Sequence, residues 1–589
     1  MTSVTTSAAS ILATVALLAT RVTLQGVEVR RPPEPTPEVK AWRGSLPEGR
    51  PALRGFRAPV LDHRAETRPI EPAGDAATKN AAAIVERDLA RRGLLATTAA
   101  ATESLASSRE AVGTEDLRAI GLPVDWLEFF RDTDSAFAFR PSLPGFEVAT
   151  ESGEHEIETV RLQITSGTYW SGAGDGGCVD LARQLIEALP EARFVASVQE
   201  SHLAGLLETA GTWPPSTGSR LVLLPEALPV AQWAQDGGKS GRVPVPGGQG
   251  YETVTLVPRY ASRGEAGAAF VPGETFLVDG FASAGLRAVQ SPLLFQGGDL
   301  LAARDPKDGS RILFLGEANV WRNTALGLTQ DQVLEAFRIE FGVDRCVVLP
   351  AVSFHLDQEL TLRAVGDRLV GFVADPVPAA KIVLACGLDA VRRSGALDAA
   401  SAAQARADLE AGKYREFLER VFPAVGARGQ GFGRHPESFS AFFSSGASDS
   451  GVGNLQRFLL ALDLLVAWSM PVDELPLEPH SLAYLRSFLR TDADRREMIA
   501  RLRSAGVEIA PVPSLPEGER GIDYLNGIHE PGRYLMPAWG GLYAPLDRAA
   551  EDAFRKALGP GNDVHPVLTS ESQRRGGAIH CSISALPGR

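Results

Sequence analysis

The sequence predicts a mixed α/β domain over residues 155–589, preceded by an extension rich in Pro and Ala. Two observations predict this class. Short β-branched or aliphatic runs, which are typical of strands, occur at residues 160–165, 194–198 and 221–224. Residues 178–189 lie between the first two runs and repeat apolar side chains at helical spacing. Strands that alternate with helices indicate an α/β fold.

The same alternation continues towards the C-terminus. Further strands are expected at residues 253–257, 275–278, 311–315, 346–349 and 369–373, with a helix at 329–341. Residues 395–470 are mainly helical in pattern, with an apolar stretch at 455–468 and a Ser/Gly-rich loop at 442–453. The final section predicts a strand at 534–537, a helix at 546–558, a strand at 564–568 and then a Gly-Gly loop. The sequence contains no exact internal repeat.

The first 154 residues are predicted to form two segments, and neither shows an evident function. Residues 30–75 are dense in Pro, Arg and Glu, so residues 1–75 are expected to be extended or disordered. Residues 76–154 are expected to form a small helical module or linker. An apolar run at residues 11–19 is too short to span a bilayer and follows no Lys or Arg. We therefore expect no transmembrane segment and a cytoplasmic location, with secretion as the alternative.

The composition excludes several classes of function. The chain has 589 residues, of which 44% are hydrophobic and 22% charged, as in ordinary globular proteins. Its net charge of −13 argues against nucleic acid or an anionic membrane as a partner. Its four cysteines form no CxxC pair, so neither a structural zinc site nor a disulfide framework is expected. Cys346 begins an aliphatic run and Cys386 ends one, and both are expected to be buried strand residues.

Cys581, His355, Asp236 and Asp357 are the candidate catalytic residues. Each is a weak signal alone, because a buried cysteine, a strand edge or a turn would explain it equally well. His355 and Asp357 are two residues apart and would share one face of a strand. Together the four supply a nucleophile, a proton carrier and two carboxylates. Two carboxylates suit a planar cationic substrate rich in N–H groups, such as a guanidinium.

The order of the motifs makes the pattern more specific. Trp-Ala-Gln-Asp (233–236), Gly-Gly-Asp (297–299), Arg-Ile-Leu-Phe-Leu-Gly (311–316), His-Leu-Asp (355–357) and Ala-Ile-His-Cys (578–581) follow one another. This order resembles the C-terminal catalytic domain of the protein-arginine deiminases, which belong to the guanidino-group-modifying pentein superfamily. Residues 534–581 are also similar to agmatine deiminase. The resemblance implies a five-bladed α/β propeller for residues 155–589, with the active site in its central channel.

The resemblance also implies a role for each residue. Cys581 would attack the guanidinium carbon, and His355 would protonate the leaving amine and then activate water. Asp236 and Asp357 would each hold guanidinium nitrogens. Trp233 would line the aliphatic stem of the substrate, and Arg575 would contact it. The implied reaction converts arginine, most simply within a protein or peptide, to citrulline and ammonia through a covalent cysteine intermediate.

Two departures from the resembled family concern calcium, which the animal enzymes require. Lys239, close after Asp236, and Leu300, directly after Asp299, stand where acidic ligands are expected. Neither a lysine nor a leucine can ligate a hard cation, so no cofactor is expected and calcium activation through these positions should be lost. Three alternatives stay open: a deiminase of free arginine or agmatine, an amidinotransferase, and a non-catalytic pentein-fold binding protein. The sequence predicts no oligomeric state.

Overall fold

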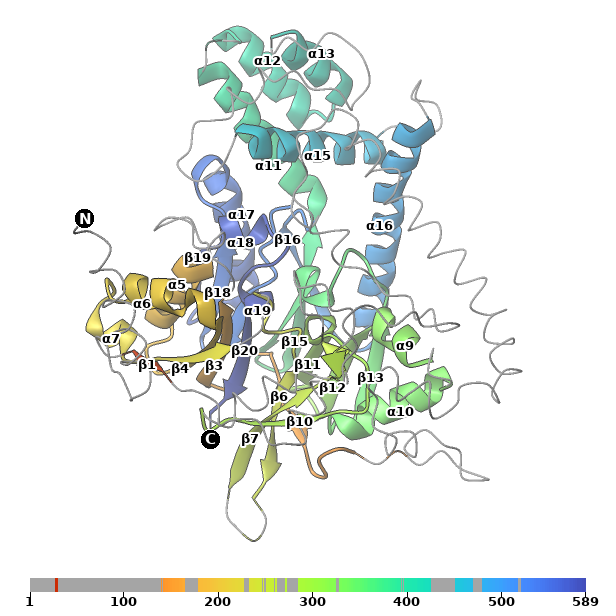
Figure 1. Ribbon diagram of the computed structural model, residues 1–589. Helices are drawn as coiled ribbons and strands as arrows, with labels where there is room; N and C mark the ends of the chain where they lie inside the picture. Colours follow the sequence, from red (N-terminus) through yellow and green to blue (C-terminus); the bar gives the residue numbers. More distant parts are fainter. Residues whose placement is uncertain are drawn as a thin grey trace, which may run out of the picture.

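The computed structural model describes residues 27–29, 139, 141–164, 178–226, 232–245, 247, 250–258, 260–261, 271–272, 284–324, 328–393, 395, 397–424, 451–469, 479–516 and 521–588 (Figure 1). Several sequence predictions lie outside these residues: the extended segment at 30–75, the helix within 76–120, the strand at 275–278 and most of the loop at 442–453. Among the described helices, none combines the length and the apolar character that a membrane span needs.

The described residues form a mixed α/β fold with several sheets, as the sequence predicts. Five of the sheets each contain a three-stranded unit of the same arrangement, in which an antiparallel strand pair is extended by a parallel third strand. In strand order, the units are β20-β3-β4, β6-β7-β10, β11-β12-β13, β14-β15-β16 and β17-β18-β19. A parallel neighbour needs a crossover connection. Helices supply it between β3 and β4, β12 and β13, β15 and β16, and β18 and β19.

The strand bounds agree with the predicted runs wherever the structure describes them. The strands are β1 (Glu28–Val29), β2 (Glu147–Val148), β3 (Ile157–Ile164), β4 (Arg193–Gln199), β5 (Leu221–Glu226), β6 (Lys239–Pro244), β7 (Tyr251–Val257), β8 (Tyr260–Ala261), β9 (Val271–Pro272), β10 (Arg287–Gln290), β11 (Leu300–Arg304), β12 (Arg311–Gly316), β13 (Arg345–Leu349), β14 (Leu360–Val365), β15 (Arg368–Asp375), β16 (Glu508–Pro513), β17 (Ile528–Glu530), β18 (Arg533–Ala538), β19 (Asp563–Leu568) and β20 (Ile583–Pro587).

The described helices are α5 (Cys178–Ala188), α6 (Leu203–Ala210), α7 (Pro215–Gly218), α9 (Glu317–Thr324), α10 (Gln330–Glu340), α11 (Pro376–Arg393), α12 (Ala399–Glu410), α13 (Tyr414–Ala424), α15 (Gly451–Ser469), α16 (Pro479–Ser504), α17 (Ala544–Leu558), α18 (Ser570–Gln573) and α19 (Ile579–Ser582). Helices α5, α10 and α17 match predicted helices, α12, α13 and α15 lie in the region expected to be mainly helical, and the sequence predicted no helix for the others. Short 3₁₀ turns are η4 (Glu200–His202), η6 (Gly297–Asp299), η7 (Leu356–Gln358) and η10 (Gly541–Tyr543).

Local chemistry explains where two of the predicted helices begin and which face they bury. Helix α10 begins after Thr329, which forms a reciprocal capping box with Gln332 and so satisfies two free N–H groups. Helix α17 buries Leu546, Ala550, Phe554 and Leu558, one residue per turn on a single face. Spacing of this kind is readable in a sequence, which is why both helices were expected.

The crossover between β15 and β16 contains a large helical segment. Helices α11, α12, α13 and α15 lie together at the top of Figure 1, and α16 runs back towards β16. Their buried side chains share one apolar cluster with residues of β15, β16 and α17. Cys386 lies in α11, so its expected place in a strand is wrong. A short apolar run does not distinguish a buried strand from a buried helix, and the run continues here as an 18-residue helix.

Residues from before position 155 also pack onto this fold. Strand β1 pairs with β5, and strand β2 pairs with β6. Val27, Phe146 and Val148 are buried. The proposed boundaries at residues 75 and 154 stay predictions, and the segment after β2 carries Glu151, which contacts the site described next.

Candidate active site

The candidate active site is built from five short segments that share one position in the fold. Each directly precedes the outer antiparallel strand of one sheet unit. The segments are the turn at residues 233–237 before β6, η6 before β11, η7 before β14, the loop at residues 523–527 before β17, and α19 before β20. Segments that are distant in sequence but equivalent in each unit therefore meet at one place.

Hydrogen bonds join these segments to one another. The backbone N–H of Gln235 donates to the carbonyl of Cys581 at 3.2 Å, which ties the 233–237 turn to α19. The backbone N–H of Leu356 donates to Asp299 Oδ1 at 3.3 Å, which ties η7 to η6. Gln358 Nε2 donates to the carbonyl of Gly576 at 2.6 Å, which ties η7 to the Gly-Gly loop. The site segments are therefore held in place by hydrogen bonds to one another as well as by the strands that follow them.

His355 and Asp357 lie in a turn, so the strand expected for this pair is wrong. His355 has extended backbone angles and is followed by η7, which contains Asp357. Both side chains are nonetheless directed to the same place. In a strand, alternate side chains would point to the same face. Here the 3₁₀ turn brings the two side chains to the same side instead.

Gly298 lies at the point where the three polar groups converge. A Cβ atom on this glycine would lie 2.7 Å from His355 Nδ1, 3.1 Å from Asp357 Oδ2 and 3.2 Å from Asp236 Oδ1. The missing side chain therefore leaves one position within reach of all three groups. The sequence suggested only a turn at Gly-Gly-Asp, and the role of Gly298 was missed, because a glycine pair does not reveal what lies opposite it.

His355 is held by two neighbours. Its Nε2 lies 3.1 Å from Gln296 Oε1, and its ring stacks on Phe354 with centroids 3.9 Å apart. Since the amide oxygen can only accept, the Nε2 proton donates to it. Nδ1 then faces Asp236 Oδ1 at 3.6 Å. The ring thus presents Nδ1 to the position beside Gly298, where it can give or take a proton.

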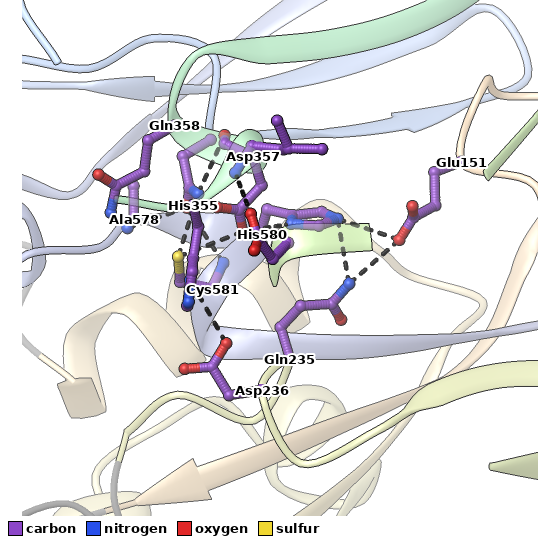
Figure 2. A network of polar contacts seen from close by, with 12 residues as sticks. Glu151, Gln235, Asp236, His355, Asp357, Gln358, Ala578, His580 and Cys581 are labelled. Carbon is purple, nitrogen blue, oxygen red and sulfur yellow. Dashed lines mark hydrogen bonds and ion pairs between the residues drawn. The ribbon is translucent and has the colours of Figure 1, made fainter. Parts of the chain in front are cut away.

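The two carboxylate oxygens of Asp357 differ in their hydrogen bonds. Oδ2 accepts from His580 Nδ1 at 2.7 Å and from Cys581 Sγ at 3.3 Å (Figure 2). Oδ1 is buried and has no hydrogen-bond partner among the described residues. Burial raises the pKa of Asp357, but the hydrogen bond and charge of His580 outweigh it and the net pKa is lowered. The carboxylate is therefore ionised, with one oxygen left to accept a donor from a ligand.

Cys581 lies in the single helical turn α19 and is 4% exposed. Asn526, which the sequence analysis missed, holds this turn: its Oδ1 accepts from the backbone N–H groups of Ala578 at 3.0 Å and Cys581 at 3.1 Å. Its Nδ2 donates to Cys581 Sγ at 3.1 Å and to the carbonyl of Asp357 at 3.2 Å. One buried amide thus positions the sulfur relative to Asp357. The only sequence signal was an Asn-Gly dipeptide, which usually marks a turn.

The Cys581 thiol is protonated in the free site. Burial raises its pKa well above the ordinary value, and the charges of Asp357 and Asp236 raise it further. The hydrogen bond from Asn526 acts in the opposite direction, because it stabilises the thiolate. A cation bound between the two carboxylates would cancel the repulsion that opposes ionisation. A cationic ligand should therefore activate this sulfur, and a neutral one should not.

We predict that Asn526→Asp lowers kcat/KM by about tenfold or more, equal to at least about one pKa unit on the thiol. The aspartate keeps the acceptor for the two backbone N–H groups but replaces the donor to the sulfur with negative charge. The rate of Cys581 alkylation by iodoacetamide against pH measures the shift. Asn562→Asp is the matched control, because Asn562 bonds Arg363 and Leu558 instead. Identical alkylation profiles for Asn526→Asp and the wild type would contradict the prediction.

His580 and Glu151 form a second set of contacts behind Asp357. His580 Nε2 lies 3.1 Å from Glu151 Oε1, and Lys239 Nζ donates to the same oxygen at 2.6 Å. Gln235 Nε2 donates to it as well, at 3.1 Å (Figure 2). Burial lowers the pKa of His580, but Asp357 and Glu151 outweigh burial and raise it to about 9. His580 is therefore an imidazolium near neutral pH, next to the nucleophile.

Of the two predicted substrate-binding residues, the structure places Trp233 beside the nucleophile. A Cβ atom on Gly577 would lie 2.6 Å from Trp233 Cζ3 and 2.9 Å from Cys581 Cβ, so the indole and the cysteine flank this glycine. Arg575 donates to Glu571 on α18 at 2.8 Å. Its contact with substrate stays a prediction.

The site does not suit calcium. Lys239 directs its ammonium at Glu151. The Asp299 carboxylate accepts from Leu356 and packs against Gly316. Among the described residues, one group has three metal-binding atoms within 4.8 Å of one another, and it consists of His355, Asp357 and Cys581. A nitrogen and a sulfur are poor ligands for a hard cation. The three are better explained as a proton carrier, a carboxylate and a nucleophile.

Comparisons with known proteins give matches only among solved structures. No protein-family model matches the chain, and no curated protein matches it. A Porphyromonas gingivalis structure assigned as an arginine deiminase is 15% identical, with 75% of this chain and 98% of that chain covered and a TM-score of 0.42. Agmatine deiminase of Enterococcus faecalis is 11% identical, with 76% and 96% covered and a TM-score of 0.41.

Agmatine deiminase of C. jejuni is similar at 10% identity, with 75% of this chain and 96% of that chain covered and a TM-score of 0.38. These neighbours are the class of protein that the sequence motifs resemble. Their sequence identities and TM-scores are too low to support a function for this chain, so a function has to be argued from the site itself.

Proposed function

We propose that the chain hydrolyses the guanidinium group of arginine to the ureido group of citrulline, with release of ammonia. One observation carries the proposal: His355 Nδ1, Asp357 Oδ2 and Asp236 Oδ1 surround a single position beside Gly298, and Cys581 Sγ contacts the same Asp357 oxygen. A guanidinium is planar and cationic, and its N–H groups would be shared between the two carboxylates. This would hold its carbon against the sulfur.

The proposed reaction has two halves that use the same residues. Binding of the cation lowers the pKa of the thiol, and the thiol proton passes to His355. The sulfur attacks the guanidinium carbon, a C–S bond forms, and His355 returns the proton to the leaving nitrogen. The C–N bond breaks and ammonia leaves. Water then loses one proton to His355 and attacks the same carbon, and a C–O bond forms. The C–S bond breaks, the sulfur takes back the proton from His355, and the remaining hydroxyl proton leaves to solvent, so that the ureido group and the free thiol result.

We infer that the five sheet units are the blades of a five-bladed α/β propeller around this site. Two observations support the inference. The units share one strand arrangement, and each places a site segment directly before its outer antiparallel strand. Five equivalent ends can meet at one site if they surround a common axis. A cytoplasmic location and a catalytic domain over residues 155–589 belong to the same proposal.

Peptidyl-arginine is the proposed substrate, because the five motifs most closely resemble enzymes that act on arginine within proteins. Free arginine, agmatine and transfer of the amidino group to an amine use the same chemistry. The buried contacts of Cys581, His355 and Asp357 favour an enzyme over a binding protein, since a protonated thiol against a carboxylate adds little to binding.

Release of ammonia and formation of the ureido product from benzoyl-arginine amide, free arginine and agmatine test the proposal, each with EDTA or with calcium. We expect release from the blocked substrate that EDTA leaves unchanged. If ammonia is released only from free arginine or agmatine, the substrate is a free small molecule and not peptidyl-arginine. A requirement for calcium would contradict the metal-independent site, and turnover only with an added amine would indicate an amidinotransferase.

A further inference from the structure

Four charged groups form a continuous chain behind the proposed substrate position. It runs from Lys239 on β6 through Glu151, which follows β2, to His580 on α19 and Asp357 on η7. The successive contacts are 2.6 Å, 3.1 Å and 2.7 Å, and Figure 2 shows the second and the third. The charges alternate in sign along the chain. Only Asp357 also contacts the sulfur.

Each charge in this chain depends on its neighbour. Burial raises the pKa of Glu151, yet the charges of Lys239 and His580 lower it to about 2. Lys239 is 3% exposed, and a buried ammonium requires a counter-ion, which Glu151 supplies. His580 in turn has one ring nitrogen against Glu151 and the other against Asp357. Without the negative charge of Glu151, the buried imidazolium would be less stable.

We propose that Glu151 and His580 are positioning residues of the deimination: Glu151, paired with Lys239, holds His580 as an imidazolium whose Nδ1–H fixes Asp357 Oδ2. This rests on the proposed function. Asp357 keeps a defined rotamer and its charge, and its free Oδ1 can accept from the guanidinium. If His580 lost its proton at Nδ1, Asp357 would repel the thiolate without a fixed orientation.

A cavity gives solvent access to this chain from outside the substrate position. Its volume is about 60 Å³, enough for a few water molecules. Among the described residues, its lining includes Glu151, His580 and His529, and neither Cys581 nor His355 is part of it. His580 can therefore exchange its proton with water while a substrate covers Cys581. The titration of His580 should then appear in kcat as well as in kcat/KM.

Among the described residues, the charged and titratable groups beside His580 are Glu151, Asp357 and His529, and Lys239 lies on the far side of Glu151. Burial, with the charges of Arg363 and His580, lowers the pKa of His529 well below its ordinary value, so His529 is neutral. Only the two carboxylates therefore stabilise the imidazolium. If catalysis needs the His580 imidazolium, the enzyme is active at pH values below the His580 pKa. It loses activity as the pH rises through that pKa.

Glu151→Gln tests the proposal, because it keeps the acceptor for His580 but removes the charge. We expect the alkaline limbs of kcat and kcat/KM to move to lower pH by about one unit or more. Glu156→Gln is the matched control, since Glu156 lines the same cavity. The double variant Glu151→Gln/Lys239→Met removes both charges and should show the same shift without an unpaired buried ammonium. Profiles that superimpose on the wild type would overturn the proposal.

A wild type without turnover on any guanidine would contradict the proposed function and leave the chain of charges to be tested directly. Histidine-selective NMR would then follow the imidazole of His580, assigned with His580→Gln. We expect the His580 pKa to fall in Glu151→Gln and not in Glu156→Gln. An unchanged His580 titration would overturn the positioning role.

Discussion

Replacement of Cys581 by serine should lower kcat for citrulline formation by about 10⁴-fold or more. A serine hydroxyl is a far weaker nucleophile than a thiolate near neutral pH, and the bound cation that activates the thiol does not ionise a hydroxyl, whose pKa is much higher. The fold should be retained, since the hydroxyl can keep the contacts of the sulfur with Asn526 and Asp357. Initial rates of citrulline release and the thermal midpoint measure the two effects separately.

Cys346→Ser is the matched control. Cys346 lies on β13 and donates to the carbonyl of Leu334, and burial raises the pKa of its thiol to about 12. It is therefore neither ionised nor near the site, and its serine variant should keep full activity. Mass spectrometry of the wild type with a slow substrate should show an adduct on Cys581. Substantial turnover by Cys581→Ala, which has no nucleophile at this position, would exclude the covalent route and with it the proposed mechanism.

The elements that the sequence predicted are those whose signals are local. The strands at β12 and β19, and the helices α10 and α17, follow from runs and periodicity that need no knowledge of distant residues. Where the local signal was ambiguous, the prediction failed. Cys386 ends an apolar run that suits a strand or a helix, and only the packing of α11 against α15 decides between them.

The site was predicted only in part, for a different physical reason. Cys581, His355, Asp236 and Asp357 carry recognisable chemistry. The structure brings the last three together beside Gly298, with the Cys581 sulfur against Asp357. Their supporting residues carry no such mark. Asn526 lies 55 positions from Cys581, and Glu151 lies 429 positions from His580. Such partners are set by which strand ends meet, and a single sequence does not encode that as a pattern. His580 could have been noticed, since it directly precedes the nucleophile.

Gly298→Ala should lower kcat/KM by about 100-fold or more while the protein still folds. The added methyl would lie 2.7 Å from His355 Nδ1 and about as close to the two carboxylates, in the position where a guanidinium has to bind. His355 cannot easily yield, because Gln296 and Phe354 hold its ring. Gly298 is not one of the glycines with positive φ, so alanine adds no backbone strain. The cost should therefore fall on substrate binding and not on the chain.

Gly588→Ala separates this effect from a general sensitivity to alanine. A Cβ atom at Gly588 meets only ordinary contacts, the nearest being the carbonyl of Glu156 at 3.5 Å. It should leave kcat/KM and the thermal midpoint unchanged. In Gly298→Ala, KM for the guanidine should rise and alkylation of Cys581 by a small neutral reagent should continue, since the sulfur keeps its own contacts. Full activity in Gly298→Ala would mean that the substrate binds elsewhere, and the convergence of His355, Asp357 and Asp236 beside Gly298 would then have no catalytic meaning.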